Sequence, residues 1–292
     1  MKPFNPLNYL KIRSKFTLFL VVPLSVILFF SMLNIEQKYS QLKNIQATER
    51  YIGISLKLAD LVHELQKERG FSAGFLGSHK ALFKAELSQQ RLQTDKQLKQ
   101  FSDSLSHFNL AESNYELKKV FLPVVEHIQL LTDVRSKVND GYPKDTFAYY
   151  SKGNATIITL IQFMQVVSDD NLLSRQSNAY SSLLWLQEYM GQERGSLSGV
   201  FAKNRITPAL LLDVSAYIRN QEKSLRDFSV IGTAEQQRLL AEKFAHPLND
   251  EVIKLRHTAI EHASRLNLLN QIQQVVGYTG LIHDFKNYVI RG

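Results

Sequence analysis

Two copies of one short phrase carry the residues best suited to binding a charged molecule. The copies are Glu68-Arg69-Gly70-Phe71-Ser72-Ala73-Gly74 and Glu193-Arg194-Gly195-Ser196-Leu197-Ser198-Gly199. Each arginine falls within an apolar stripe of helical spacing, the first being Leu58, Val62, Leu65, Arg69, Ser72 and Leu76 and the second Leu183, Leu186, Met190, Arg194, Leu197 and Phe201. A buried cation without a partner costs several kcal/mol. Each arginine therefore needs a counter-charge, which is either a carboxylate of the protein or an anion from outside.

Internal pairing is the simpler source of that counter-charge. Arg135 also lies on an apolar stripe, between Leu131 and Val138, so this position alone does not identify a ligand site. The two glycines of each phrase are spaced so that another helix backbone can come close. Internal pairing does not account for repetition of the whole phrase. Glu68 and Glu193 directly precede their arginines, so on a helix they point away from them and are poor partners.

Composition excludes several classes of protein. The chain of 292 residues is long enough for one large or two moderate domains, and 7 prolines with 13 glycines leave little room for disorder. It contains no cysteine, so disulfides and thiolate chemistry are excluded. The 8 histidines are scattered, with no spacing typical of a metal site. No nucleophile with a base and no carboxylate pair presents itself, so we predict neither an enzyme nor a cofactor.

Half of the net charge of +8 lies at the N-terminus. Lys2, Lys11, Arg13 and Lys15 precede the first acidic residue, Glu36. The other basic residues are finely mixed with the acidic ones, which is typical of a solvated surface and not of a nucleic-acid-binding patch.

An uncharged apolar segment at 16–35 follows these basic residues. At ~1.5 Å rise per residue it is long enough to cross a ~30 Å hydrocarbon core, and a membrane helix tolerates Pro23. The alternative is a cleaved signal peptide, but the segment is long for one and no Ala-x-Ala site follows it. The positive-inside rule places residues 1–15 in the cytoplasm and the chain after Glu36 on the far side of the membrane.

The rest of the chain is predicted to be all-α. Turn signals separate helices ending near 76 and covering 81–108, 113–138, a segment extending toward 168 with Gly153 near its start, 172–201, 207–230, 234–244 and 249–276. Asn139 to Pro143 form a strong turn cluster, and Thr207-Pro208 is typical of a helix start. Connections this short predict antiparallel neighbours in a helical bundle.

Leu65-Gln66-Lys67-Glu68-Arg69-Gly70, soon after a membrane helix, and Gly191-Gln192-Glu193-Arg194-Gly195, in a later helix, together resemble the signature helices of the nitrate- and nitrite-sensing (NIT) domain family of bacterial receptors. The resemblance covers roughly residues 50–270. It implies a sensor made of two four-helix bundles that binds nitrate or nitrite through arginines and regulates an attached output, and it suggests a homodimer. By this similarity Arg69 and Arg194 bind the anion, and a third arginine is expected from a late helix. Arg256 is the candidate, because it lies on a stripe with Val252 and Ala259.

The chemistry of arginine suits such a ligand. Nitrate is a planar monoanion with poor acceptors, and the guanidinium fork offers paired donors that an ammonium cannot. At ~6 Å and an effective dielectric of ~20, each arginine and the anion attract by about 3 kcal/mol before desolvation. An anion would draw together two helices whose arginines otherwise repel, which provides a two-state switch.

These expectations divide the chain into a cytoplasmic basic tail at 1–15, a transmembrane helix at 16–35, a periplasmic helical sensor at 36–275 and the stub of a further helical segment at 276–292. No second membrane span and no output module appear, so we expect the sequence to be the N-terminal part of a longer bacterial inner-membrane receptor. The alternative is a membrane-anchored helical interaction protein whose arginines are paired internally and which binds no small molecule.

Overall fold

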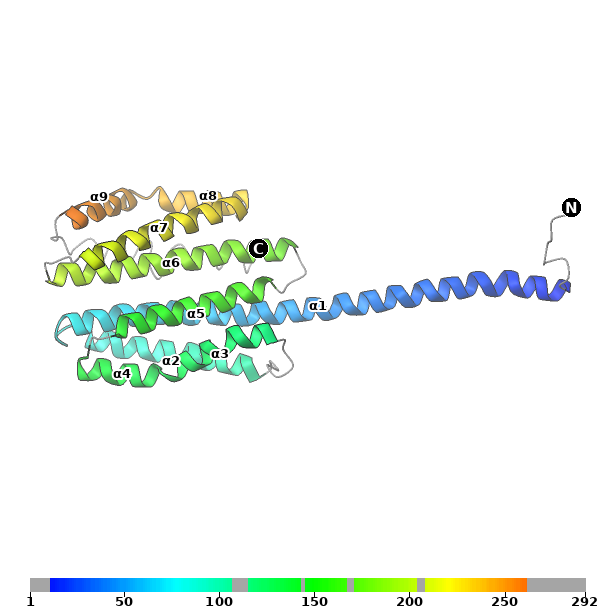
Figure 1. The fold of residues 1–292 in the computed structure, drawn as a ribbon, viewed down its shortest axis with the longest axis horizontal. Helices are drawn as coiled ribbons and strands as arrows, with labels where there is room; N and C mark the ends of the chain where they lie inside the picture. Colours follow the sequence, from blue (N-terminus) through cyan, green and yellow to red (C-terminus); the bar gives the residue numbers. More distant parts are fainter. Residues whose placement is uncertain (1–10, 107–114, 143–144, 167–170, 204–207, 262–292) are drawn as a thin grey trace. The chain divides into compact units, whose positions relative to one another are not determined.

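The chain is all-α throughout its described part. The computed structural model describes residues 11–106, 115–142, 145–166, 171–203 and 208–261, and no strand occurs among them. The helices are α1 (Ile12–Gly77), α2 (Lys84–Ser106), α3 (Tyr115–Gln129), α4 (Leu131–Asp140), α5 (Thr146–Val166), α6 (Asn171–Lys203), α7 (Pro208–Ile231), α8 (Ala234–Phe244) and α9 (Pro247–Glu261) (Figure 1). The predicted fold class is confirmed.

Local sequence explains where several helices begin and end. α4 ends at the predicted turn cluster, where Gly141 adopts φ +89° and its amide donates to the carbonyl of Val138 at 3.0 Å. α7 begins with Pro208, whose missing N–H is not needed in the first turn. α8 begins with a capping box, in which Thr233 and Gln236 satisfy each other's backbone amides.

Two predicted helices differ from those observed, and a third lies partly outside the described residues. The helix expected at 113–138 is interrupted at Leu130 between α3 and α4, although no glycine or proline lies at the break. Gly153 lies inside α5 and not near its start. The absence of a side chain at this position lets the ring of His127 pack against the helix. α9 is described only as far as Glu261, so the expected continuation to 276 and the predicted stub at 276–292 lie outside the described residues.

The chain comprises two units, residues 1–49 and 50–292, and α1 contributes to both. In the first unit, the large apolar side chains that are described between Phe16 and Ile35 are exposed. Two polar side chains of this segment bond to their own helix: the Ser25 hydroxyl donates to the Val21 carbonyl at 2.7 Å, and the Asn34 amide donates to the Phe30 carbonyl at 2.8 Å. Among the described helices, α1 is long and apolar enough to cross a membrane, by length and composition.

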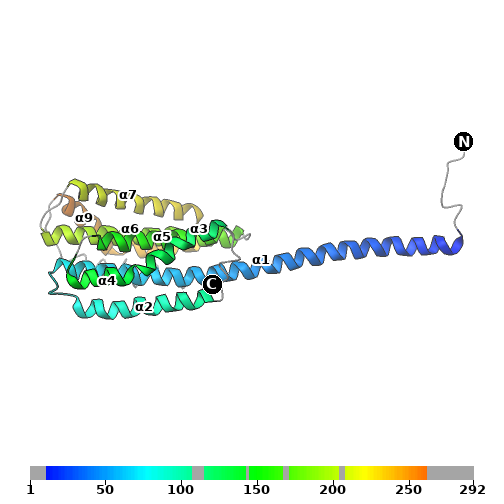
Figure 2. The same cartoon turned by 60° about the horizontal axis from the view of Figure 1, so that its bottom comes forward.

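In the second unit, α1 and α6 pack side by side in the same direction. The pairs His63–Gln187, Gln66–Glu188 and Arg69–Glu188 follow the same order along both helices. α5 runs antiparallel to α1, since Ser55 contacts Met164 and Arg69 contacts Ser151 (Figure 2). A continuous apolar core joins α1, α3, α5 and α6 and includes Leu58, Leu61, Phe121, Ile158, Ile161 and Leu183. The parallel packing of α1 and α6 brings the two phrase-bearing segments to the same end of the bundle.

Candidate functional site

Arg69 is buried among three helices, with 2% of its surface exposed. Its Nη1 donates to Oε1 of Glu188 on α6 and to the hydroxyl of Ser151 on α5, the latter at 2.8 Å. The ring of Phe147, also on α5, lies 5.1 Å from the guanidinium carbon and adds a cation–π contact. The prediction that Arg69 points into the core is confirmed, and its internal acidic partner is Glu188.

The other terminal nitrogen of Arg69 is a buried donor without an acceptor. Within the part of the chain that the structure describes, no hydrogen-bond partner reaches Nη2. Nη2 faces Gly191 of α6, where a Cβ atom would lie only 2.7 Å away. Glycine therefore lets the guanidinium approach the α6 backbone. Since buried polar groups are nearly always hydrogen-bonded, Nη2 is a donor that can accommodate an acceptor beyond those of the described residues.

Glu188 is a fully buried carboxylate held by four donors. Oε1 accepts from Arg69 and from the Gln192 amide at 2.7 Å, whereas Oε2 accepts from the Gln66 amide at 2.9 Å and from the Asn154 amide at 3.0 Å. Sequence reasoning missed this residue. The signal that could have found it is a second stripe on α6, in which Ser181, Leu184, Glu188 and Gly191 recur at helical spacing.

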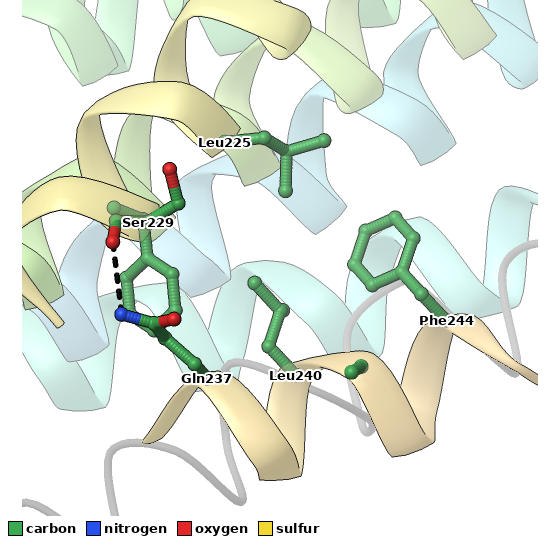
Figure 3. A pocket seen from close by; sticks show the side chains of 7 residues that line it. Leu225, Ser229, Gln237, Leu240 and Phe244 are labelled. Carbon is green, nitrogen blue, oxygen red and sulfur yellow. Dashed lines mark hydrogen bonds between the residues drawn. The ribbon is translucent and has the colours of Figure 1, made fainter. Parts of the chain in front are cut away.

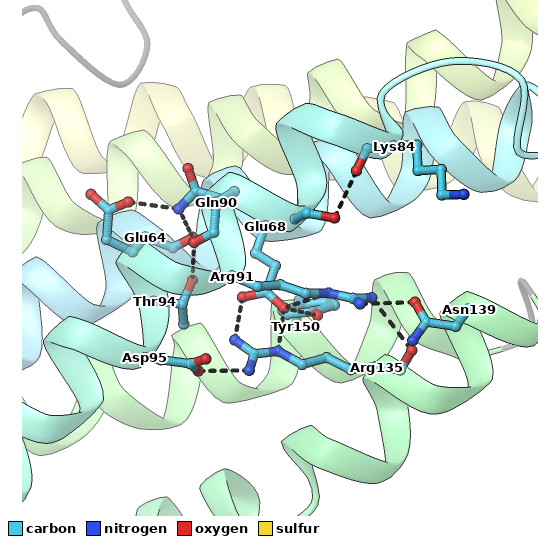
Figure 4. A network of polar contacts seen from close by, with 11 residues as sticks. Glu64, Glu68, Lys84, Gln90, Arg91, Thr94, Asp95, Arg135, Asn139 and Tyr150 are labelled. Carbon is cyan, nitrogen blue, oxygen red and sulfur yellow. Dashed lines mark hydrogen bonds and ion pairs between the residues drawn. The ribbon is translucent and has the colours of Figure 1, made fainter.

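Glu68, the first glutamate of the repeated phrase, belongs to a separate network (Figure 4). Arg135 of α4 holds it in a fork, with Nε at 2.7 Å from Oε1 and Nη2 at 2.8 Å from Oε2. Tyr150 of α5 donates to Oε1 at 2.9 Å, and Arg91 of α2 adds an ion pair at 3.7 Å. Asp95 of α2 accepts from Nη1 of Arg135 at 2.6 Å. As expected, Glu68 does not pair with Arg69, and the inward position of Arg135 is explained by this fork.

The protonation of Tyr150 supports the same network. Burial raises the pKa of Tyr150 well above its usual range, and the negative charge of Glu68 raises it further. The phenol therefore stays protonated and remains a hydrogen-bond donor to the carboxylate.

Glu193, the glutamate of the second phrase, repeats this arrangement. Arg256 of α9 donates from Nε to Oε1 at 2.5 Å and from Nη2 to Oε2 at 2.7 Å. Gln221 of α7 donates to Oε2 at 2.7 Å and accepts from Arg256 at 2.9 Å. In each half of the unit an arginine from a later helix clamps the phrase glutamate, and a polar residue of the intervening helix, Asp95 or Gln221, binds that arginine.

Arg194 lies on α6 one helical turn after Gly191, the residue against which Arg69 packs. Its side chain is only half-buried, although sequence analysis placed it in the core. The structure thus brings Arg69 to the turn of α6 that precedes Arg194, and it places Arg256 on Glu193. The roles of Arg69, Arg194 and Arg256 in binding a ligand stay predictions.

The two halves differ at the position equivalent to Glu188. Arg194 follows Arg69 by 125 positions, and at the same offset Glu188 corresponds to His63. The imidazole of His63 lies 3.2 Å from the amide of Gln187. An acidic residue therefore faces Arg69 from α6, whereas the equivalent position on α1 is a histidine.

An apolar groove lies elsewhere, between α7 and α8 (Figure 3). Its volume is about 300 Å³, and it is lined by Leu225, Phe228, Ser229, Gln237, Leu240, Ala241 and Phe244. None of these side chains carries a charge. The groove therefore lacks the donors that a small anion needs and is separate from the arginine site.

Comparison with known proteins places these features in a family. The profile of the NIT family, described as nitrate and nitrite sensing, matches residues 60–285 and includes both phrases and all three predicted arginines. This match covers more than half of the sequence. The chain therefore belongs to the nitrate- and nitrite-sensing (NIT) family, as its resemblance predicted, and the family is one of sensing and not of catalysis.

The fold also has a solved counterpart. The structure of the NasR transcription antiterminator is similar to this one, with a TM-score of 0.75 and 21% sequence identity over 91% of this chain and 75% of that chain. At this identity the likeness shows a shared helical fold. A comparison with curated protein sequences gives no match.

Proposed function

We propose that this chain is a membrane-anchored sensor that binds nitrate or nitrite between α1 and α6 and passes a conformational signal toward the membrane. The observation that carries the proposal is the buried Nη2 of Arg69, which faces Gly191 and has no acceptor in the described part of the chain. Membership of a nitrate- and nitrite-sensing family supplies the class of ligand.

Arg194 completes the proposed site from the next turn of α6. Two guanidinium groups on neighbouring helices can bind a planar anion through several charge-assisted hydrogen bonds. Arg256 is the third proposed contact. Since its fork holds Glu193 in the structure, Arg256 reaches an anion only by exchanging that carboxylate.

Calorimetric titration of the full chain in detergent with nitrate, nitrite, chloride and sulfate tests the proposal. Wild-type protein should bind nitrate or nitrite. Arg69→Lys keeps the charge opposite Glu188 but loses the planar fork, and it should weaken binding at least tenfold. Arg194→Ala should weaken it similarly, whereas Arg238→Ala, an exposed arginine of α8, should not. Retained helicity in circular dichroism with unchanged affinity in Arg69→Lys would reject the proposal.

The anchor is the apolar part of α1. Its exposed apolar side chains, its internally bonded polar ones and the preceding basic residues favour a membrane helix with a cytoplasmic N-terminus and a periplasmic sensor. We further propose a homodimer whose output module lies outside this sequence. Resistance of the chain to carbonate extraction would support the anchor, and light scattering of the detergent-solubilised chain would test the dimer.

One observation favours the alternative, an interaction protein without a small ligand. Arg69 and Arg256 each contact a buried glutamate of the same chain. If these pairs were the whole purpose of the arginines, none of the four anions would bind or change the melting temperature.

A further inference from the structure

Glu188 and Arg69 make contact through a single guanidinium nitrogen. Arg69 contacts the Glu188 carboxylate through Nη1 alone, whereas Arg135 and Arg256 each donate to their glutamates from two nitrogens. The single-point contact leaves Nη2 available beside Gly191. An anion bound at Nη2 would share one guanidinium with Glu188.

The carboxylate is anchored independently of Arg69. Gln66 and Asn154 hold Oε2, and Gln192 holds Oε1. These amides come from α1, α5 and α6, so three helices fix the negative charge at the same place. Glu188 therefore stays beside a bound anion and does not need to leave.

We propose that Glu188 restricts the anion site to monovalent ligands. This inference rests on the proposed function and extends it. The fixed negative charge of Glu188 lies beside the bound anion, and the repulsion that it exerts on a dianion such as sulfate is twice that on nitrate or nitrite. Because Glu188 is buried, salt screens this repulsion little.

Coulomb's law gives the scale of the selection. The repulsion between two unit charges about 5 Å apart, at an effective dielectric of about 20, lowers a binding constant by roughly a hundredfold. The penalty doubles in free energy for a dianion, so Glu188 opposes sulfate much more strongly than nitrate.

The test is Glu188→Gln in the full chain, titrated with nitrate and with sulfate. Glutamine keeps the size of the side chain and removes its charge. We expect nitrate to bind at least tenfold more tightly than to wild type, and sulfate, which wild type excludes, to bind measurably. A purely structural role of Glu188 would not create sulfate binding.

Two variants separate charge from damage to the fold. Glu188→Asp keeps the charge on a shorter side chain, so it should still exclude sulfate. Glu68→Gln removes an equally buried glutamate that pairs with Arg135 and not with Arg69, so it should lose stability without gaining sulfate binding.

Each outcome has a distinct meaning. If wild type binds nitrate and Glu188→Gln keeps the wild-type anion preference, the charge-selection inference is wrong and the proposed function stands. If Glu188→Gln does not fold, wild type still decides, because comparable affinity for sulfate and nitrate contradicts the inference. If wild type binds no nitrate, the proposed function fails and the inference fails with it.

Discussion

At the scale of residues, several charged side chains of this protein are buried in its core. Glu68 and Glu188 are completely buried, and Arg69 is almost so. Such charges are tolerated only when partners satisfy them, and here each glutamate accepts several hydrogen bonds. The charged pairs link neighbouring helices, while Nη2 of Arg69, which has no acceptor among the described residues, is the reason for proposing Arg69 as a ligand contact.

The Glu68–Arg135 fork should be a large single contribution to stability. Arg135→Ala would leave Glu68 buried with only Tyr150 and the distant Arg91, which we expect to cost about 3 to 5 kcal/mol of unfolding free energy. Arg238→Ala removes an arginine from exposed pairs and should cost no more than about 0.5 kcal/mol. Urea denaturation of both variants measures the difference, and equal midpoints would contradict the structural role of the fork.

The sequence predicted some of these residues and not others. Arg69 could be found because an arginine in an apolar helical stripe is unusual, and the repeated phrase drew attention to it. Glu188 lies outside the phrase, and one-dimensional spacing does not show which helices become neighbours. The pairing of Glu193 with Arg256 was missed for the same reason, since the two are 63 positions apart.

At the scale of elements, the close approach of α1 and α6 depends on glycine. Gly191 lets Arg69 of α1 lie against the α6 backbone, and Gly195 in the same way lets the ring of Phe147 from α5 approach α6. The sequence indicated that the glycines of each phrase admit another helix. It did not show that α1 and α6 run in parallel, because short connections predict only antiparallel neighbours along the chain.

A matched pair of glycine substitutions tests this packing. In Gly191→Ala the added methyl group would meet Nη2 of Arg69 at 2.7 Å, so we expect nitrate affinity to fall at least tenfold. Gly53→Ala, in the same kind of helical backbone on α1, meets nothing within 4 Å and should stabilise the helix by about 0.5 to 1 kcal/mol. Calorimetry should therefore show weaker nitrate binding by Gly191→Ala, and thermal unfolding should show a higher melting temperature for Gly53→Ala. Wild-type nitrate affinity in Gly191→Ala would count against the site.

At the scale of the whole molecule, a ligand that binds only the folded state must raise its stability. At a nitrate concentration of about 100 times the dissociation constant, the gain is about 2.7 kcal/mol. For a helical unit of this size we expect the melting temperature to rise by several degrees. Sulfate at equal ionic strength is the control and should give no rise. A nitrate-independent melting temperature would favour the interaction-protein alternative.

The duplicated framework has one more consequence. The two halves share their clamped phrase glutamates. The glutamate that contacts Arg69 is not repeated in the other half, because His63 occupies the position equivalent to Glu188. The second contact of Arg69 on α6 differs as well, since Gly191 corresponds to Gln66 at the same offset. If the proposed site binds nitrate, the stoichiometry measured by calorimetry should accordingly be one anion per polypeptide.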